Sequence, residues 1–100
     1  MSTSMRVRPI GGSMEVGPVE TAIRSIRARI AENPYILVEL PMRVHLREIT
    51  LEGFVVTIHC YIKASSEDKF LDRQQALLEE VTKILAENKV VYVWSEPDVM

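Results

Sequence analysis

A chain of 100 residues has room for one globular domain. Its 47% hydrophobic and 26% charged residues, with only four glycines and five prolines, exclude a disordered or collagen-like chain. A net charge of −2 argues against a basic nucleic-acid-binding domain. A single cysteine argues against a Cys-rich zinc site or a disulfide framework. No apolar run approaches the roughly 20 residues of a bilayer span, which argues against a transmembrane segment.

The charge is divided unevenly between the two halves of the chain. Residues 1–50 contain seven Arg and five Glu, a net charge of +2, whereas residues 51–100 contain five basic and nine acidic side chains, a net charge of −4. Two interpretations fit. The halves supply helices with different solvent-facing surfaces, or one half of the chain meets the opposite half of a neighbouring copy in head-to-tail packing.

The N-terminal region is expected to begin with a flexible tail, residues 1–4, followed by a single domain over residues 5–100. Residues 5–8 alternate apolar and charged side chains, which is typical of a half-exposed strand. Pro9 and the two glycines that follow it end this strand, since proline lacks the N–H that a strand ladder needs.

A first helix is predicted from Gly17 at the N-cap and Pro18 at the first helical position, where a missing N–H costs nothing. Asn33 ends it, because the residue before Pro34 is disfavoured in the α region. The apolar side chains that recur at helical spacing form its buried stripe: Val19, Ala22, Ile23, Ile26 and Ile30.

A β-hairpin is predicted next. Residues 42–47 alternate apolar and polar side chains, and residues 54–63 do the same after a turn within residues 48–53. The two runs are therefore expected to pair as antiparallel strands.

A second helix is predicted to open at Ser65-Ser66, and Ser65 has capping-box spacing with Asp68 three residues later. Residues 90–94 form a final strand, which Pro97 ends. The apolar stripe of the second helix comprises Phe70, Leu77, Leu78, Val81, Ile84 and Leu85.

The predicted order is therefore β-α-β-β-α-β. Right-handed crossovers place both helices on one face of a four-stranded antiparallel sheet, an α+β fold of the ferredoxin-like type with the first and third strands at its centre. Because this fold carries many unrelated functions, it does not by itself identify one.

Side chains that could carry chemistry are few, and no catalytic, cofactor-binding or metal site is predicted. With the hairpin turning near residue 50, His45 and His59 share a face but stand about 13 Å apart, too far to share a zinc ion. Cys60 falls among the inward-facing positions and is expected to pack in the core. The glycines at Gly11 and Gly12 lack the further residues of a phosphate-binding loop.

Three other functions found in this fold each require particular residues at particular places. RNA-binding modules stack bases on aromatic residues of the central strands, and the first strand here has none. An acylphosphatase-type enzyme needs an Arg in the loop before the first helix, and residues 11–17 contain none. An amino-acid-sensing regulatory domain needs a Gly-rich polar loop there, and Gly11-Gly12-Ser13 is a weak version, so this remains the alternative function.

The helix-free face of the predicted sheet mixes Arg, His and aromatic side chains. Such a mixture is either an ordinary solvated face or a subunit interface, since Arg, Tyr and Trp are enriched at interfaces. The candidate interface residues are Arg43, His45, Arg47, Val55, His59, Tyr61, Tyr92 and Trp94.

Residues 19–99 resemble the C-terminal cytoplasmic α/β domain of the small-conductance mechanosensitive ion channel family. The resemblance rests on residues 42–48, on residues 54–63, on Pro34 after the first helix, and on the apolar spacing of the second helix.

This resemblance implies a non-enzymatic domain without a cofactor, whose copies surround a hollow cage on the cytoplasmic side of a membrane. The parent channel would release ions and osmolytes under osmotic stress, with its transmembrane part outside this chain. The partner is then the chain itself, and this piece alone is expected to be monomeric or weakly associated.

Overall fold

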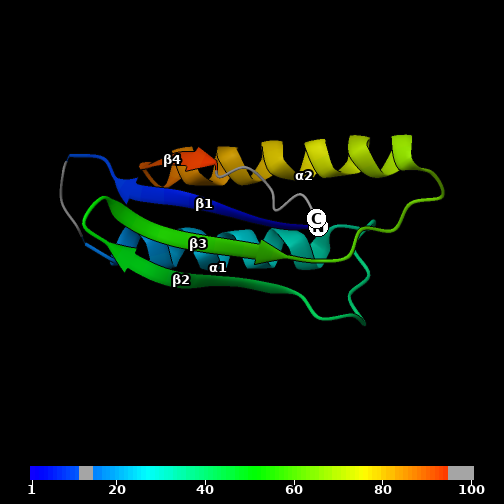
Figure 1. Cartoon of the computed structure of the whole chain (residues 1–100), viewed down its shortest axis with the longest axis horizontal. Helices are drawn as coiled ribbons and strands as arrows, with labels where there is room; N and C mark the ends of the chain where they lie inside the picture. The colour runs from blue at the N-terminus through cyan, green and yellow to red at the C-terminus, as the bar shows by residue number, and fades with distance from the viewer. Residues whose placement is uncertain (12–14, 95–100) are drawn as a thin grey trace.

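The structure is a computed structural model that describes residues 1–11 and 15–94. Four strands form one antiparallel sheet in the order β2-β3-β1-β4, and both helices cover the same face of it (Figure 1). The elements are β1 (Ser2–Pro9), α1 (Gly17–Glu32), β2 (Arg43–Thr50), β3 (Gly53–His59), α2 (Glu67–Glu87) and β4 (Val90–Trp94). The predicted α+β, ferredoxin-like arrangement with the first and third strands at the centre is confirmed.

The strand β1 begins earlier than its sequence pattern indicates. Residues 2–4, expected to form a flexible tail, pair with β3, and Thr3 is buried. The sequence Ser-Thr-Ser shows no alternation of apolar and polar residues, so it does not predict a strand. Polar contacts to the neighbouring segment help to hold this part of β1 in the sheet. The hydroxyl groups of Ser4 and Thr57 are 3.3 Å apart, and the Met1 ammonium donates to the Cys60 carbonyl at 2.6 Å.

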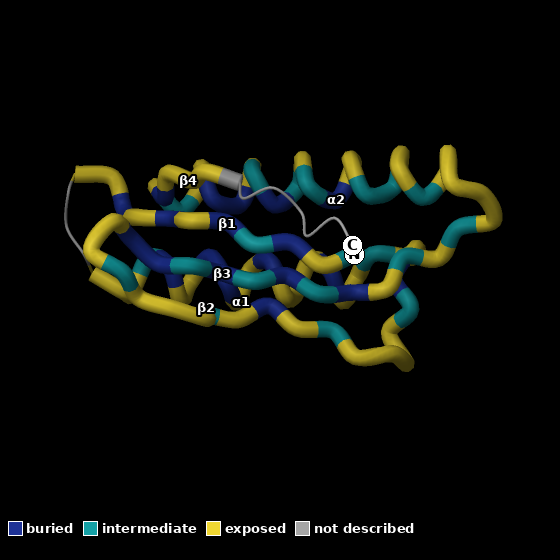
Figure 2. Tube along the Cα trace, viewed as in Figure 1, coloured by how far each residue is buried: buried dark blue, intermediate teal, exposed yellow. Residues whose placement is uncertain are grey.

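The core lies between the sheet and the two helices, where inward-facing strand residues meet one stripe of each helix (Figure 2). Both helical stripes follow the predicted spacing, although Phe70 and Leu78 are only partly buried. The largest fully buried side chains are Met5, Ile26, Ile30, Ile58, Leu77 and Leu85.

Both helices have their N-cap one residue away from the predicted position. The N-cap of α1 is Val16, so that Gly17 and Pro18 are already helical. The N-cap of α2 is Ser66, whose hydroxyl accepts from the Lys69 N–H at 3.2 Å, so the expected capping box of Ser65 with Asp68 is not formed. At the other end of α1, extended Asn33 precedes Pro34 as predicted.

The hairpin of β2 and β3 turns more tightly than expected. Its last pair is Thr50 with Gly53, which leaves only two residues in the turn, and the Thr50 hydroxyl donates to the Gly53 carbonyl at 3.0 Å. A β-bulge at Arg47 shifts the register, since Leu46 pairs with Val56 whereas Glu48 pairs with Val55.

Gly53 lies where β3 leaves the turn and approaches the central strand closely. Its φ of +148° lies in a region that side-chain-bearing residues rarely adopt, and a Cβ there would lie 2.6 Å from the Val7 carbonyl oxygen. Only glycine fits this position without a shift of the β1 backbone.

Replacing Gly53 with Ala is therefore expected to lower the free energy of unfolding by about 1–3 kcal/mol. Gly17→Ala is the matched control, because nothing lies within 4 Å of the added Cβ and it should leave stability unchanged or raise it slightly. Urea denaturation of the two variants measures the difference. Equal stabilities would contradict the close approach of Gly53 to β1.

Leu78 of α2 is less buried than the core residues Ile26 and Ile58, all three of which the apolar spacing of their elements predicts to face inward. Ile26 and Ile58 are 0% exposed, as predicted, whereas Leu78 lies on the side of α2 and is only partly buried. Helical spacing indicates the side of the helix on which Leu78 lies, but it does not show how completely the neighbouring elements cover that position.

We expect Ile58→Ala to cost about 2–5 kcal/mol of stability, since it leaves a cavity among closely packed neighbours. Leu78→Ala should cost less than about 2 kcal/mol, because solvent reaches part of the space that it vacates. Denaturant titrations of both variants test the order, and a larger loss at Leu78 would contradict the core described above.

Candidate subunit interface

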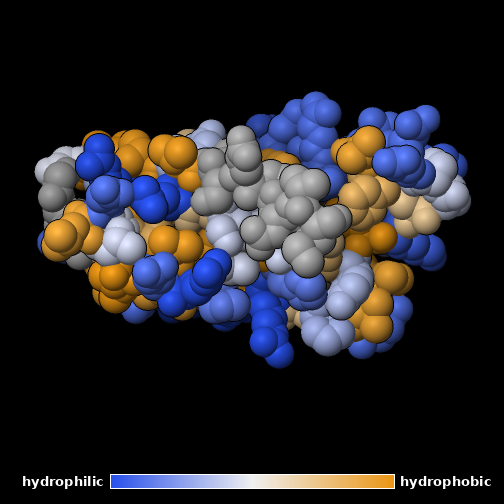
Figure 3. Space-filling view, viewed as in Figure 1, coloured by the Kyte–Doolittle hydropathy of each residue, from blue (hydrophilic) through white to orange (hydrophobic). Residues whose placement is uncertain are grey.

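The helix-free face of the sheet presents the polar halves of β2 and β3. Val44, Val56 and Ile58 are buried against the helices, so the alternate residues project to the opposite side. Of the predicted interface residues, this face holds Arg43, His45, Val55 and His59, with Arg47 at the bulge and Tyr61 just beyond β3. Hydrophilic side chains gather over the lower part of the view in Figure 3, where Figure 1 shows β2.

The two histidines lie closer together than predicted. His45 pairs with Thr57, and His59 pairs with Arg43, so the histidines are diagonal neighbours about 7–8 Å apart at Cα rather than about 13 Å. The expected register was wrong because the turn lies at Leu51 and Glu52 rather than near residue 50, and the bulge at Arg47 offsets one residue of this difference. His59 makes an edge-to-face contact with Tyr61, with ring centroids 5.2 Å apart.

These histidines do not belong to a metal cluster in the part of the chain that is described. Within residues 1–11 and 15–94, no group of three His, Cys, Asp or Glu side chains is placed to hold a metal ion. The nearest cation to His59 by register is Arg43, directly opposite on β2.

The remaining two predicted interface residues, Tyr92 and Trp94, lie on β4. The prediction that Tyr92 contributes to the helix-free face is wrong. Tyr92 pairs with buried Val7, so Tyr92 projects on the helix-covered side. Trp94 pairs with Met5 through its backbone, and its side chain lies outside the described residues. The helix-free side of β4 instead presents Val91 and Val93, of which Val93 is 69% exposed. All residues of this strand are apolar, so no alternation could indicate which of them face outward.

The loop that an amino-acid-sensing domain would use is only partly described. Gly11 has a φ of +99° and open space around it, whereas Gly12 and Ser13 lie outside the described residues, as does Pro97. The described part of this loop brings no polar side chain toward Gly11 that would favour a ligand site there.

Cys60 is buried at the end of β3, as predicted. Its side chain is 0% exposed, and burial raises the pKa of the thiol, while the charge of the N-terminal ammonium lowers it by less. A raised pKa leaves the thiol protonated near neutral pH, which is the opposite of what a cysteine nucleophile needs.

Comparison with protein families identifies the class of the chain. Residues 9–92 match the family described as "Mechanosensitive ion channel MscS, C-terminal". The chain belongs to this family. The match begins before residue 19, where the resemblance was recognised from sequence, and ends before residue 99.

Solved structures agree in fold. A variant of Arabidopsis thaliana MSL1 superposes with a TM-score of 0.80 at 15% identity over 93% of this chain. Arabidopsis thaliana MSL1 itself gives 0.75 at 16% identity over 92% of this chain. The chain spans only 34% and 33% of those two structures. No curated protein matches the chain by sequence.

Neither helix could cross a membrane, as far as the described residues go. The longer of them, α2, carries charged side chains along most of its length.

The burial of Cys60 predicts slow reaction with a thiol reagent. At about pH 8, the aromatic disulfide reagent DTNB should modify the native protein at least about 100-fold more slowly than the protein unfolded in guanidinium, because the thiol must first be exposed by an opening of the structure. Cys60→Ser, which should not react in either state, is the control. Equal rates in the two states would contradict the buried position.

Proposed function

We propose that this chain is a non-enzymatic structural domain of a mechanosensitive ion channel, on the cytoplasmic side of the membrane. The observation that carries the proposal is the family match over residues 9–92. The fold shared with MSL1 over more than nine-tenths of the chain supports it.

The domain acts, in this proposal, by associating with further copies of itself. The helix-free face supports this role, because it combines Arg43, His45 and Tyr61 at the surface with half-buried Val55. Arg and Tyr are residue types that protein interfaces favour over the remaining surface.

The conducting part of such a channel would lie elsewhere in a longer protein. This chain spans about a third of the MSL1 structures that it matches. Release of ions and osmolytes under osmotic stress is therefore proposed for the parent channel, to which this domain contributes shape and subunit contacts.

A chimaeric channel tests this function. When the 100-residue chain replaces the matching segment of a family member, the chimaera should give tension-gated currents in membrane patches and protect cells from osmotic downshock. Ile26→Asp places a charge at a fully buried position and should abolish both, which controls for a requirement that the domain be folded. A chimaera that reaches the membrane but gives no current, while the host channel conducts, would contradict the proposal.

A further inference from the structure

An open hollow of about 360 Å³ lies where α1 meets the beginning of the edge strand β2. This volume is at the lower end of the roughly 300–1,000 Å³ that small-molecule sites occupy. Three of its five lining residues carry nitrogen donors in their side chains, and none carries a carboxylate. The lining residues are Arg27, Met42, Arg43, Val44 and His45. The hollow is therefore suited to a small anion.

A hydrogen bond holds Arg27 at the rim of this hollow. Its guanidinium donates to the Val44 carbonyl at 2.5 Å, so α1 presents a positive charge at the edge of β2. A guanidinium carries five N–H donors in a planar fork that matches the oxygens of a phosphate or a carboxylate. The bond to Val44 uses one of these donors and leaves others for a ligand. Arg27 is thus fixed in place and still able to donate.

Arg43 and His45 reach the hollow from the other face of the sheet. They flank buried Val44 on β2, so both side chains project away from the helices, and both residues are exposed. No hydrogen bond or ion pair joins either side chain to another of the residues that the structure describes. Their N–H groups are therefore available to a ligand at the edge of β2, opposite those of Arg27.

Charges of both signs surround the hollow without lining it. On α1 and on β2 alike, an arginine comes next to the lining and a glutamate lies farther along the element. Glu20 precedes Arg27 by seven residues of helix, and Glu48 follows His45 by three residues of strand, about 10 Å in each case. The excess of positive charge is therefore confined to the hollow. The charged and titratable side chains nearby are Glu20 and Arg24 on α1, Glu39 before β2, Arg47 and Glu48 on β2, and His59 on β3.

We propose that this hollow binds the phosphate group of a small soluble phosphomonoester. The phosphate oxygens would accept from Arg27 on one side and from Arg43 and His45 on the other. Charge-assisted hydrogen bonds of this kind are roughly twice as strong as neutral ones, and an arginine can make two in parallel to one phosphate. The remainder of the ligand would lie against the apolar part of Met42. This site goes beyond the proposed structural role, and it is contained in one copy of the domain.

The mixed surroundings favour a small anion over an extended one. A nucleic acid or an anionic membrane surface presents many charges, and its binding strengthens with each Lys or Arg that meets them. Around this hollow such a partner would also meet Glu39 and Glu48, which repel it. A phosphomonoester carries its charge on one group and contacts the lining alone. The two oxygens of a carboxylate lie in one plane with its carbon, whereas a tetrahedral phosphate can present oxygens to donors on both sides.

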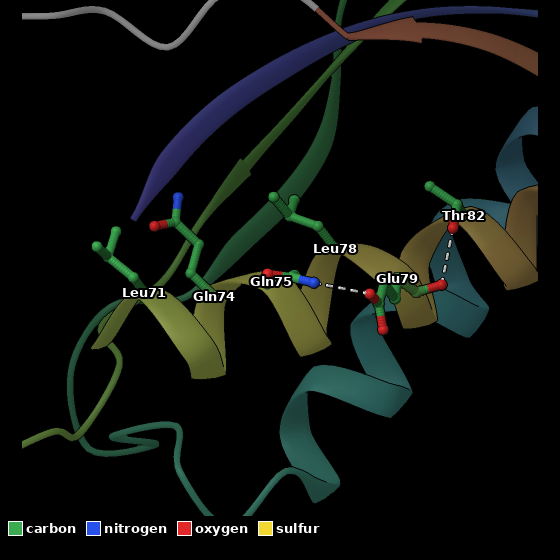
Figure 4. Close-up of a pocket in the computed structure, with 6 residues that line it drawn as sticks. All are labelled: Leu71, Gln74, Gln75, Leu78, Glu79 and Thr82. Carbon is green, nitrogen blue, oxygen red and sulfur yellow. Dashed lines mark hydrogen bonds between the residues drawn. The ribbon is translucent and has the colours of Figure 1, made fainter. Parts of the chain in front are cut away.

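A second open hollow, of about 400 Å³ on α2, has the opposite character (Figure 4). Leu71 and Leu78 project to the same side of the helix beside it. Gln75 donates from its amide to the Glu79 carboxylate at 3.1 Å, and the Thr82 hydroxyl donates to the Glu79 backbone carbonyl at 2.8 Å. Two leucines and a carboxylate offer no binding to a phosphate. This groove on α2 therefore serves as an internal reference, which phosphate should not perturb.

Titration of the isotope-labelled chain, followed by the nuclear magnetic resonance signals of its backbone amides, tests the site. Inorganic phosphate and glycerol 3-phosphate are the probes, each added at constant ionic strength with chloride as the balancing anion, so that general screening is the same at every point. The signals of residues 42–45 should shift and saturate with either probe, and those of the groove on α2 should not move. Glycerol 3-phosphate should bind more tightly than phosphate, because it also contacts Met42.

Substitutions at exposed positions separate the site from a general effect of charge. Arg43→Gln and His45→Gln should each weaken phosphate binding about tenfold, the change expected for the loss of one charge-assisted hydrogen bond. Arg27→Lys keeps the charge but loses the planar fork, so it should weaken binding as well. Arg29→Gln is the matched control, because Arg29 lies on α1 beside Glu80 of α2, outside the hollow, and the affinity should be unchanged. Circular dichroism and melting temperature establish that each variant is folded.

Saturable shifts confined to the hollow, weakened by Arg43→Gln but not by Arg29→Gln, would support the proposal. Shifts that do not saturate, or that both variants weaken equally, would overturn it. Vesicles of phosphatidylcholine with and without phosphatidic acid separate a lipid from a soluble ligand, because the headgroup of phosphatidic acid is also a phosphomonoester. Co-sedimentation that requires both phosphatidic acid and Arg43 would assign the phosphate to a lipid, against the proposal. None of these results depends on self-association, so the proposed function is tested separately.

Discussion

The pairing of β1 on both of its sides is the constraint on which the rest of the structure depends. Val7 lies opposite Phe54 of β3 and opposite Tyr92 of β4, so one central residue joins three distant parts of the chain. With β1 occupied on both sides, β2 and β4 become the two edges of the sheet. The right-handed crossovers then put both helices on one face, and no other described helix or strand covers the opposite face of the sheet.

Arginines attach the helices to the periphery of this sheet. Arg27 of α1 donates to Val44 of β2, and Arg73 of α2 donates to the Lys63 carbonyl while its guanidinium stacks 3.9 Å from the centre of the Tyr35 ring. Guanidinium groups suit this position, because their long apolar stems cross the edge of the core while their donors reach backbone oxygens. At Arg27 the hydrogen bond to the Val44 carbonyl joins α1 to the edge strand β2.

Much of the fold could be predicted because hydrophobic spacing records which side of an element is buried. The alternation in β2 and β3 and the helical stripe that contains Ile26 identified the elements, their order and the core. The differences occur where spacing carries no information. Residues 2–4 are polar and yet pair with β3, and Arg47 adds a bulge that no periodicity reveals.

The candidate interface was harder to predict for the same physical reason. A strand in which every residue is apolar, such as β4, does not indicate its face, so Tyr92 was placed on the wrong side and Val93 was missed. Leu78 follows the helical period of the core, yet it is only partly buried. Surfaces of this kind are defined by where elements end, which depends on tertiary structure and not on local pattern.

The chain shares its fold with structures to which it has little similarity in sequence. The MSL1 structures share 15–16% of residues with this chain, but they superpose over more than nine-tenths of it. The core positions that determine this fold, such as Ile26 and Ile58, are fully buried and require apolar side chains of suitable size. The same arrangement of sheet and helices can therefore persist while most residues change.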